Sequence, residues 1–289
     1  MVVLFGVFVL GLALVLVVGA VTYRAQVHVP WFQPVAWSRE LGRRIPVVPA
    51  ALLIGLAGTE AAFLIGLPTG WAAAALEDSV DWPVFRWVSR HVHDGVFTDL
   101  MNACTKMGNI FEIRVACIIG AIVLALAWRK YFYIPPIIIL STFILEKFAQ
   151  KALAKIIDRG HPPTTLGTYP SGGVARLLSI VGVMVFLALL LVPNLSRRLR
   201  FTVWTGFAGL VWIETFSRTY LSKHWITDAI GGVVLGTLLL FSVVGATAAL
   251  TRNIAPAYGG SVSFDSRPTP RTDDSADPDT VGAGPRHAV

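Results

Sequence analysis

Long apolar stretches recur along the chain and alternate with short polar segments. A helix needs about 20 apolar residues to cross a hydrocarbon core roughly 30 Å thick. Seven stretches are long enough to be read as spans, at about 2–22, 47–75, 114–129, 131–150, 176–194, 201–217 and 228–250. Continuous apolar runs such as Ile134–Leu145 lack the alternation of β-barrel strands. The pattern therefore predicts an all-α, polytopic membrane bundle.

The segment between the second and third spans is more polar, but its apolar residues recur at helical spacing. These residues are Val92, Val96, Phe97, Leu100, Met101, Cys104 and Met107. The spacing predicts an interfacial amphipathic helix within residues 76–113.

The apolar pattern also predicts the division of the chain. Residues 1–46 form an uncleaved N-terminal transmembrane helix with a basic cytoplasmic loop, and residues 47–250 form a transmembrane core. Residues 251–289 contain almost no large apolar side chain, so they cannot bury enough surface to offset the entropy of ordering. We expect a disordered cytoplasmic tail there.

Composition supports the membrane interpretation: 55% of the residues are hydrophobic and only 14% are charged. The net charge of +7 would be compatible with a nucleic-acid partner. The basic residues, however, form short clusters between apolar runs, where they set topology and meet anionic lipids. We therefore expect membrane lipids and no nucleic acid as partners; the oligomeric state is left open.

Lysine and arginine collect on alternate loops. One side carries Arg24, Arg39, Arg43, Arg44, Arg129, Lys130, Arg197, Arg198, Arg200 and Arg252. Short basic loops are retained in the cytoplasm, so this side is predicted to be cytoplasmic. Segments 76–113, 151–175 and 218–227 then lie on the non-cytoplasmic side, and the residues suited to chemistry lie in them.

One of these segments, Ser217–Asp228, joins two apolar helices. His224 and Asp228 are four residues apart, so on one helix face the carboxylate would hold one imidazole nitrogen and leave the other free for nucleophilic attack. Arg218 offers a planar set of donors that suits phosphate oxygens. The alternative is that these are interfacial residues, with Arg218 paired to Glu214 and His224 solvated among the headgroups.

A second cluster, Tyr169–Ala175, precedes the next apolar helix. Ser171 is a candidate N-cap, and Gly172 and Gly173 would allow bare backbone N–H groups to approach an anion at the positive end of the helix dipole. This arrangement favours a phosphate cradle. An isolated motif of this kind is also compatible with an ordinary capped helix start.

A third cluster lies upstream on the helix that ends near residue 156. Lys147, Lys151 and Lys155 are spaced by four residues, and the loop Asp158–Pro163 contains Arg159 and His161. The lysines predict a positive stripe that reaches the same membrane face as the other two clusters. Alternatively, they are lysines that snorkel at a helix end.

The three clusters, in this order, resemble the motifs of the type 2 phosphatidic acid phosphatase superfamily. The resemblance covers roughly residues 47–250, and the third motif, S-R-x5-H-x3-D, matches at every defining position. It implies a six-helix phosphatase-like core, to which the first helix is an addition, and hydrolysis of lipid phosphates or polyprenyl diphosphates without metal or cofactor. His224 would form a phosphohistidine and Asp228 would orient it. The phosphate binders would be Arg218, Ser171 and the backbone of Gly172 and Gly173.

The first two motifs depart from the family pattern. Gly173 stands where the family has a histidine that protonates the leaving group, and His161 and Ala154 stand where it has arginine and lysine. A general acid is worth roughly 10²–10⁴ in rate for a poor leaving group, whereas a phosphate leaving group needs less help. The loss therefore favours a diphosphate substrate, or another acid. If the loss limits monoester hydrolysis, Gly173→His should raise it.

Neighbouring residues are candidates to replace the lost groups. His161 lies in the same loop and titrates near neutral pH, so it is the candidate acid. Arg159, with Lys151 or Lys155, could restore phosphate binding by a shift in register.

The sequence thus predicts a multi-pass cell-membrane phosphatase with its active site on the non-cytoplasmic side. One alternative keeps the fold but passes the phosphoryl group to a lipid or sugar acceptor. Another is a non-catalytic lipid-binding or scaffolding protein, which the altered motifs support and the intact third motif opposes.

Overall fold

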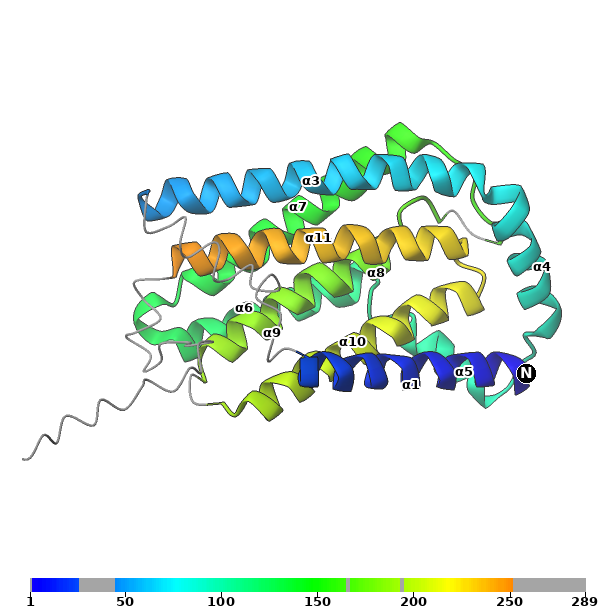
Figure 1. Ribbon diagram of the computed structural model, residues 1–289, viewed down its shortest axis with the longest axis horizontal. Coiled ribbons are helices and arrows are strands. Elements are labelled where there is room, and N and C mark those ends of the chain that lie inside the picture. The colour runs from blue at the N-terminus through cyan, green and yellow to red at the C-terminus, as the bar shows by residue number, and fades with distance from the viewer. Residues whose placement is uncertain (1, 26–44, 165–166, 193–194, 252–289) are drawn as a thin grey trace, which may run out of the picture.

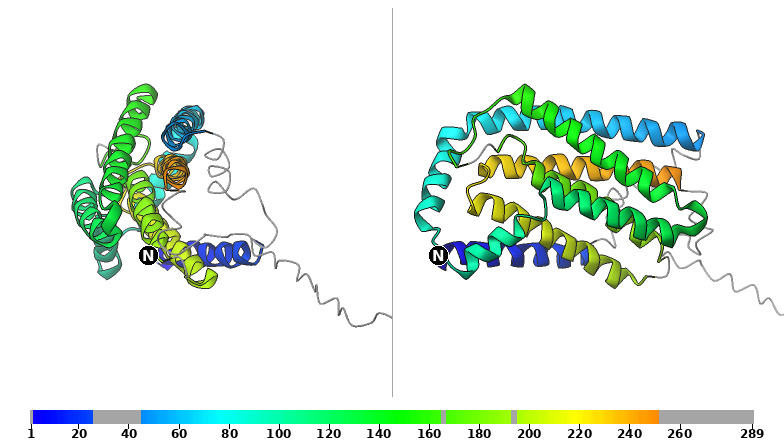
Figure 2. Two further views of the ribbon diagram at one scale, coloured as in Figure 1. Left: turned by 90° about the vertical axis from the view of Figure 1, so that its left-hand side faces the viewer. Right: turned by 180° about the vertical axis from the view of Figure 1, so that it is seen from behind.

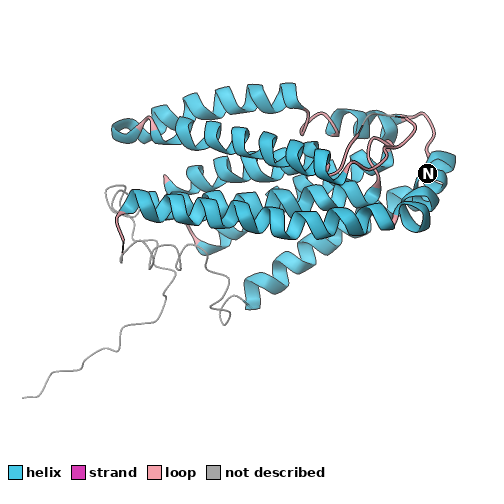
Figure 3. Cartoon of the chain, turned by 90° about the horizontal axis from the view of Figure 1, so that it is seen from above, coloured by secondary structure: helices cyan, strands magenta, loops and turns pink. Residues whose placement is uncertain are grey.

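A computed structural model describes residues 2–25, 45–164, 167–192 and 195–251. All secondary structure in these ranges is helical (Figures 1 and 3). The long helices run side by side, and α4 crosses one end of the bundle (Figure 1). The all-α prediction is confirmed. The basic cluster at 39–44 and the predicted disordered tail, apart from Thr251, lie outside the described residues.

Seven helical stretches correspond to the seven predicted spans. The long helices are α1 (Val2–Ala25), α3 (Val47–Ala75), α6 (Ile110–Trp128), α7 (Ile134–Ile157), α10 (Arg197–Tyr220) and α11 (Ile226–Leu250). The remaining stretch runs through α8 (Gly172–Arg176), the π-helical turn η4 (Leu177–Val181) and α9 (Gly182–Leu190). All of these except α7 and α10 are both long and apolar enough to cross a membrane.

The polar segment after α3 differs from its prediction. It forms a π-helical turn, η2 (Glu77–Asp81), and two short helices, α4 (Trp82–His91) and α5 (Val96–Cys104), where we expected one amphipathic helix. Gly95 interrupts the helix with φ 153°, a value that favours glycine. The prediction of a single helix was wrong because helical spacing of apolar residues continues across this break.

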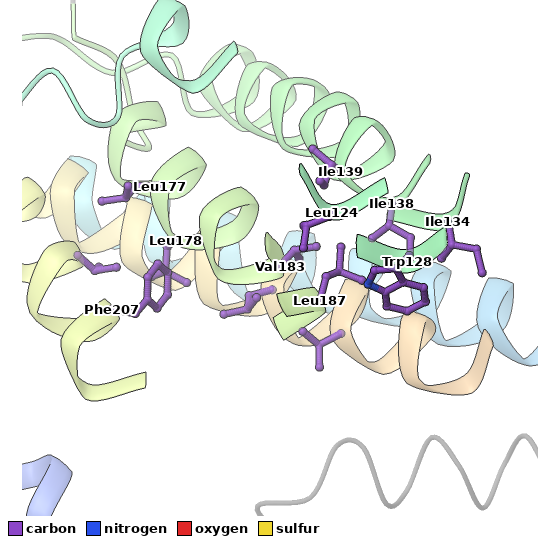
Figure 4. Close-up of a cluster of buried hydrophobic side chains, with 13 residues drawn as sticks. Leu124, Trp128, Ile134, Ile138, Ile139, Leu177, Leu178, Val183, Leu187 and Phe207 are labelled. Atoms are coloured by element: carbon purple, nitrogen blue, oxygen red, sulfur yellow. The ribbon is translucent and has the colours of Figure 1, made fainter. Parts of the chain in front are cut away.

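The largest hydrophobic cluster lies where α6, α7, α9, α10 and α11 meet (Figure 4). Its members are Leu124, Trp128, Ile134, Ile138, Ile139, Leu177, Leu178, Val183, Leu187, Phe207, Val211, Leu240 and Val244. Helix α3 packs along α11, and a small residue permits the close approach: a Cβ at Gly58 would lie 2.4 Å from Ser242 Oγ. Small residues at such contacts are typical of membrane helix pairs.

Helix α1 lies outside the core and packs on α10 (Figure 2). Trp212 Nε1 donates a hydrogen bond to the carbonyl of Phe8 at 3.2 Å, and the absence of a side chain at Gly11 leaves room for the Trp212 ring. The rings of Phe8, Phe97 and Phe216 contact one another. The first helix is thus attached to the core through an aromatic cluster.

The three segments that carry the candidate chemistry meet at one end of the bundle. Figure 1 shows α4, the end of α10 and the start of α11 at the same end, with α8 beginning nearby. The short helix η3 (Arg129–Tyr131) lies between α6 and α7 at the opposite end. The loops between successive spans therefore lie at alternate ends of the bundle, as the predicted order of the spans requires.

Candidate active site

His224 and Asp228 face each other at the start of α11. The imidazole Nδ1 lies 3.6 Å from Asp228 Oδ2. His224 precedes the helix, whose N-cap is Trp225, so the two residues do not share one helix face as the spacing suggested. A turn through Ser222, with φ 55°, sets the position of the segment instead. The separation is that of an ion pair and exceeds a hydrogen bond.

The imidazole is enclosed by the loop that follows α7. A Cβ at Gly167 would lie 2.9 Å from His224 Nδ1, so the backbone of this loop packs directly against the ring. Trp225 Nε1 donates to the carbonyl of Gly160 at 3.0 Å, and Thr164 Oγ1 donates to the carbonyl of Ser222 at 2.5 Å. The His224 side chain is only 10% exposed, so it is not simply solvated among headgroups.

A small pocket lies beside the imidazole. It is lined by Asp81, Val84, Phe85, Thr219, Ser222, His224, Trp225 and Ile226. Helix α4 contributes part of the wall, and the ring centroids of Phe85 and Trp225 are 5.7 Å apart. Access to the histidine is therefore bounded by aromatic side chains.

Burial lowers the pKa of the His224 imidazole, because the charged form loses its hydration. Asp228 opposes this shift, and the positive charges of Arg218 and Arg176 add to it. The ring is thus neutral at pH 7. With Nδ1 directed at Asp228, Nε2 is the nitrogen that remains for chemistry.

Arg159 lies among acidic groups and does not present its guanidinium to an open site. It donates hydrogen bonds to Asp81 and, at 2.8 Å, to Thr227 Oγ1. Its Nη1 is also 3.5 Å from Asp228 Oδ1, and its side chain is 2% exposed. Asp81 in turn accepts from the N–H of Thr227 at 3.1 Å. Arg159 therefore connects η2 to the first turn of α11.

Arg218 is held by three acceptors from two parts of the chain. Its Nε donates to Glu214 Oε1 at 2.7 Å, which is the pairing weighed from the sequence. Its Nη2 donates to the carbonyl of Thr105 at 2.9 Å and to Asn109 Oδ1 at 2.8 Å. Nη1 has no hydrogen-bond partner among the described residues. The guanidinium is fixed with one edge left for a ligand.

The segment at the start of α8 meets both α10 and α11. The N–H of Ser171 donates to the carbonyl of Asp228 at 2.9 Å, and a Cβ at Gly173 would lie 2.4 Å from Arg218 Nη2. Ser171 occupies the N-cap position, but its side chain makes no capping bond. Its hydroxyl is buried without a hydrogen-bond partner in the described part of the chain. The structure thus brings Ser171, Gly173, Arg218 and the His224–Asp228 pair together.

A second arginine, Arg176, lies over the neighbouring glycine. A Cβ at Gly172 would be 2.8 Å from Arg176 Nη1. Arg176 Nε donates to the carbonyl of Gly108 at 3.2 Å, and Nη1 lies 3.8 Å from the buried Glu146. The turn between α5 and α6 therefore contacts both arginines, since it also supplies Thr105 and Asn109 to Arg218.

Three predicted site residues form no hydrogen bond or ion pair with this cluster in the described part of the chain. His161 is exposed, and its Nδ1 lies 3.0 Å from the carbonyl of Pro162. Lys151 and Lys155 are exposed, and the buried face of α7 is formed by other residues, among them Glu146 and Leu153. The lysine stripe points away from the site because it lies on the exposed face of α7. The structure does not support these three as acid or phosphate ligands.

Sequence reasoning missed several residues that surround the site, namely Asp81, Thr105, Gly108, Asn109, Glu146, Arg176 and Thr227. For Glu146 and Arg176 there was a signal, because an ionisable residue within an apolar span is more often functional than accidental. The others give no pattern that local spacing can detect.

Comparison with known proteins gives three matches. The PAP2 superfamily profile matches residues 136–252. Phosphatidylglycerophosphatase B of Bacillus subtilis (strain 168) is 28% identical over 159 residues, which are 51% of this chain and 73% of the relative. A crystal structure described as the first transmembrane PAP2 type phosphatidylglycerolphosphate phosphatase from Bacillus subtilis aligns with a TM-score of 0.56 and 22% identity. That alignment covers 64% of this chain and 93% of the solved one.

The profile begins in α7 and ends after α11, so it includes all three clusters described above. The structural match shows the same fold over most of the solved chain. We conclude that the chain is a multi-pass membrane protein with the fold of the solved phosphatase, and that its residues 136–252 match the PAP2 superfamily.

Proposed function

We propose that this protein is a membrane phosphatase in which His224 attacks the terminal phosphate of a lipid phosphate or diphosphate. The observation that carries the proposal is a buried imidazole that faces Asp228, where the Ser171–Gly173 backbone meets both Asp228 and Arg218. A nucleophile of this kind requires a free nitrogen and an orienting partner for the other one. His224 has both.

In the first step, His224 Nε2 forms a bond to phosphorus while the bond from phosphorus to the leaving oxygen breaks. Asp228 stabilises the positive charge that develops on the ring, as its Oδ2 contacts Nδ1. In the second step, water attacks phosphorus, releases inorganic phosphate and restores the neutral imidazole. Arg218 and the backbone around Gly173 stabilise charge on the phosphoryl oxygens.

The leaving group distinguishes the two substrate classes. An alkoxide must gain a proton as it departs, and with Gly173 in place of histidine the proton comes from solvent. A phosphate leaves as a stable anion and needs no such help. The curated relative is named for phosphatidylglycerophosphate, a monoester, so both classes belong in the test.

The site is proposed to act on the non-cytoplasmic side. Helix η3, which contains Arg129 and Lys130, lies at the opposite end of the bundle from the start of α11, which His224 precedes (Figure 1). Short basic loops are retained in the cytoplasm. A reporter fused within residues 160–170 should give a non-cytoplasmic signal. A cytoplasmic signal would contradict this orientation.

The test measures phosphate release by the purified full-length protein in detergent from three substrates: phosphatidylglycerol phosphate, phosphatidic acid and a polyprenyl diphosphate. His224→Ala should abolish release, and His93→Ala, which changes an exposed histidine after α4, should not. Activity on none of the substrates, or equal activity in His224→Ala, would contradict the proposal.

The same assay distinguishes a transferase. Transfer of phosphate to an added alcohol or sugar, with no release of inorganic phosphate, would favour that alternative.

A further inference from the structure

We propose that Arg176 is a second phosphate-binding arginine of this site. It would supply the cation that the family pattern places at positions occupied here by Ala154 and His161. The inference rests on the proposed function, because it names a further ligand of the same phosphate.

The hydrogen bonds of Arg176 leave most of its donors available. A guanidinium has five N–H donors, one on Nε and two on each Nη atom. In Arg176 the Nε donor is used by the carbonyl of Gly108. The two Nη atoms have no hydrogen-bond partner among the described residues, and the Arg176 side chain is 17% exposed. Arg176 thus presents four unused donors.

The pairing with Glu146 does not account for these donors. A structural arginine–carboxylate pair normally forms two parallel hydrogen bonds at about 2.7–2.9 Å. Here the shortest approach is 3.8 Å, and both oxygens of the buried Glu146 lack hydrogen-bond partners in the described chain. Glu146 neutralises the charge of Arg176 within the bundle without occupying its hydrogen-bonding edge.

The free edge points toward the same backbone that Arg218 covers. Arg176 Nη1 would contact a Cβ at Gly172, as Arg218 Nη2 would contact one at Gly173. The two glycines are adjacent, and the unpartnered, buried hydroxyl of Ser171 precedes them. Two guanidinium groups, a hydroxyl and bare backbone therefore converge, a donor set that fits a tetrahedral oxyanion.

The same turn positions both arginines. Gly108 accepts from Arg176, while Thr105 and Asn109 accept from Arg218. A Cβ at Gly108 would lie 2.4 Å from the carbonyl oxygen of Gly173, so this turn also touches the glycine backbone. The position of Arg176 is therefore set by the same turn that positions Arg218.

The test uses inhibition by inorganic phosphate, measured together with KM for the best substrate. Arg176→Gln alone would leave Glu146 buried without a counter-charge, so the decisive variant is Glu146→Gln/Arg176→Gln, which removes both charges. We expect this double variant to bind phosphate more weakly, on the order of tenfold to a hundredfold, as loss of charged hydrogen bonds implies. Glu146→Gln alone should bind phosphate at least as tightly as the wild type.

Two further variants sharpen the result. Arg176→Lys keeps the charge but loses the planar fork, so its phosphate inhibition constant should lie between the wild type and the double variant. Arg114→Gln, which removes one positive charge at an exposed position on α6, should match the wild type.

If Arg176 only neutralised Glu146, removing both would restore phosphate binding and KM to wild-type values, and the inference would be overturned while the proposed function stood. A wild-type protein that neither hydrolyses the substrates nor binds phosphate would overturn both.

Discussion

Segment 217–228 and segment 151–176 both reach the same end of the bundle, but they contribute to the site in different ways. The first provides Arg218, His224 and Asp228 from consecutive turns, in the spacing that the family motif has. The second matches the motif only in part. Its lysines are exposed, its Arg159 is paired with Asp81, and its Gly173 lies under Arg218.

This difference shows where a local sequence pattern is enough to predict the geometry of the site. In 217–228 the proposed nucleophile His224 and its partner Asp228 are four residues apart, and the turn through Ser222 together with the start of α11 brings them to 3.6 Å. In 151–176 we propose that the charges the motif lacks are compensated by Arg176, which lies in the same segment but outside the motif. Arg176, Glu146 and the turn between α5 and α6 surround the glycines, and none of them belongs to the motif.

The largest effect is expected at Asp228. Asp228→Asn keeps the shape but removes the charge that orients the imidazole and stabilises its cation, and in a comparable triad this change lowers turnover about 10⁴-fold. Rates of phosphate release at saturating substrate test this. A loss of less than tenfold would mean that segment 217–228 does not carry the chemistry.

Arg218→Lys should lower kcat/KM by roughly 10²–10³, the range found when a preorganised donor to a developing charge is removed. The lysine keeps the charge near the buried Glu214 but cannot reach Thr105 and Asn109 together. An unchanged kcat/KM would show that the Arg218 guanidinium only holds the turn between α5 and α6 in place.

Gly173 tests the other segment. From the sequence, Gly173→His was expected to raise monoester hydrolysis by restoring the acid. The structure reverses this expectation, because a Cβ there would lie 2.4 Å from Arg218 Nη2 and 2.6 Å from its Cζ. Displacing a positioning group by about 1 Å can cost about 10²-fold in rate, so Gly173→Ala and Gly173→His should both lower activity on every substrate. A selective gain on monoesters in Gly173→His would contradict this packing.

The pH dependence should show a small effect near neutrality. Only the neutral imidazole is a nucleophile, and burial lowers the pKa of His224 below its usual value of 6.5. The midpoint of protonation therefore lies below pH 6.5, and kcat/KM should change little between pH 8 and neutrality and decline under more acidic conditions. A decline centred above pH 7 would indicate a raised pKa and a different environment for the ring.

The smallest effect is expected at the exposed lysines. Lys151→Gln/Lys155→Gln should change kcat/KM less than about twofold at physiological salt, since exposed charges are well screened. A loss of kcat/KM comparable to that of Arg218→Lys would indicate that these lysines bind the substrate phosphate.

The fold was largely predictable because bilayer thickness makes apolar run length informative. The seven predicted spans correspond to helices in the structure. Predicted and observed ends differ by several residues at most, and the span at 47–75 has the same ends as α3. The break at Gly95 was not predicted, since the apolar periodicity continues through it.

Much of the candidate site was predictable from short motifs, but the long-range contacts that hold it were not. His224, Asp228 and Arg218 follow from one short segment, but the contacts of Arg159 with Asp81 and of Arg218 with Thr105 span 78 and 113 residues. The lysine stripe shows a second limit. A repeat of four residues defines a helix face, but it does not tell which face is buried.

The central claim is that His224 carries the phosphoryl group during turnover. The most direct measurement quenches the protein in alkali during turnover of terminally ³²P-labelled substrate and locates the label. The account predicts an acid-labile, alkali-stable phosphate on His224 that is absent in His224→Ala and accumulates when hydrolysis is slowed. Turnover with no label on the protein, or with label on another residue, would contradict it.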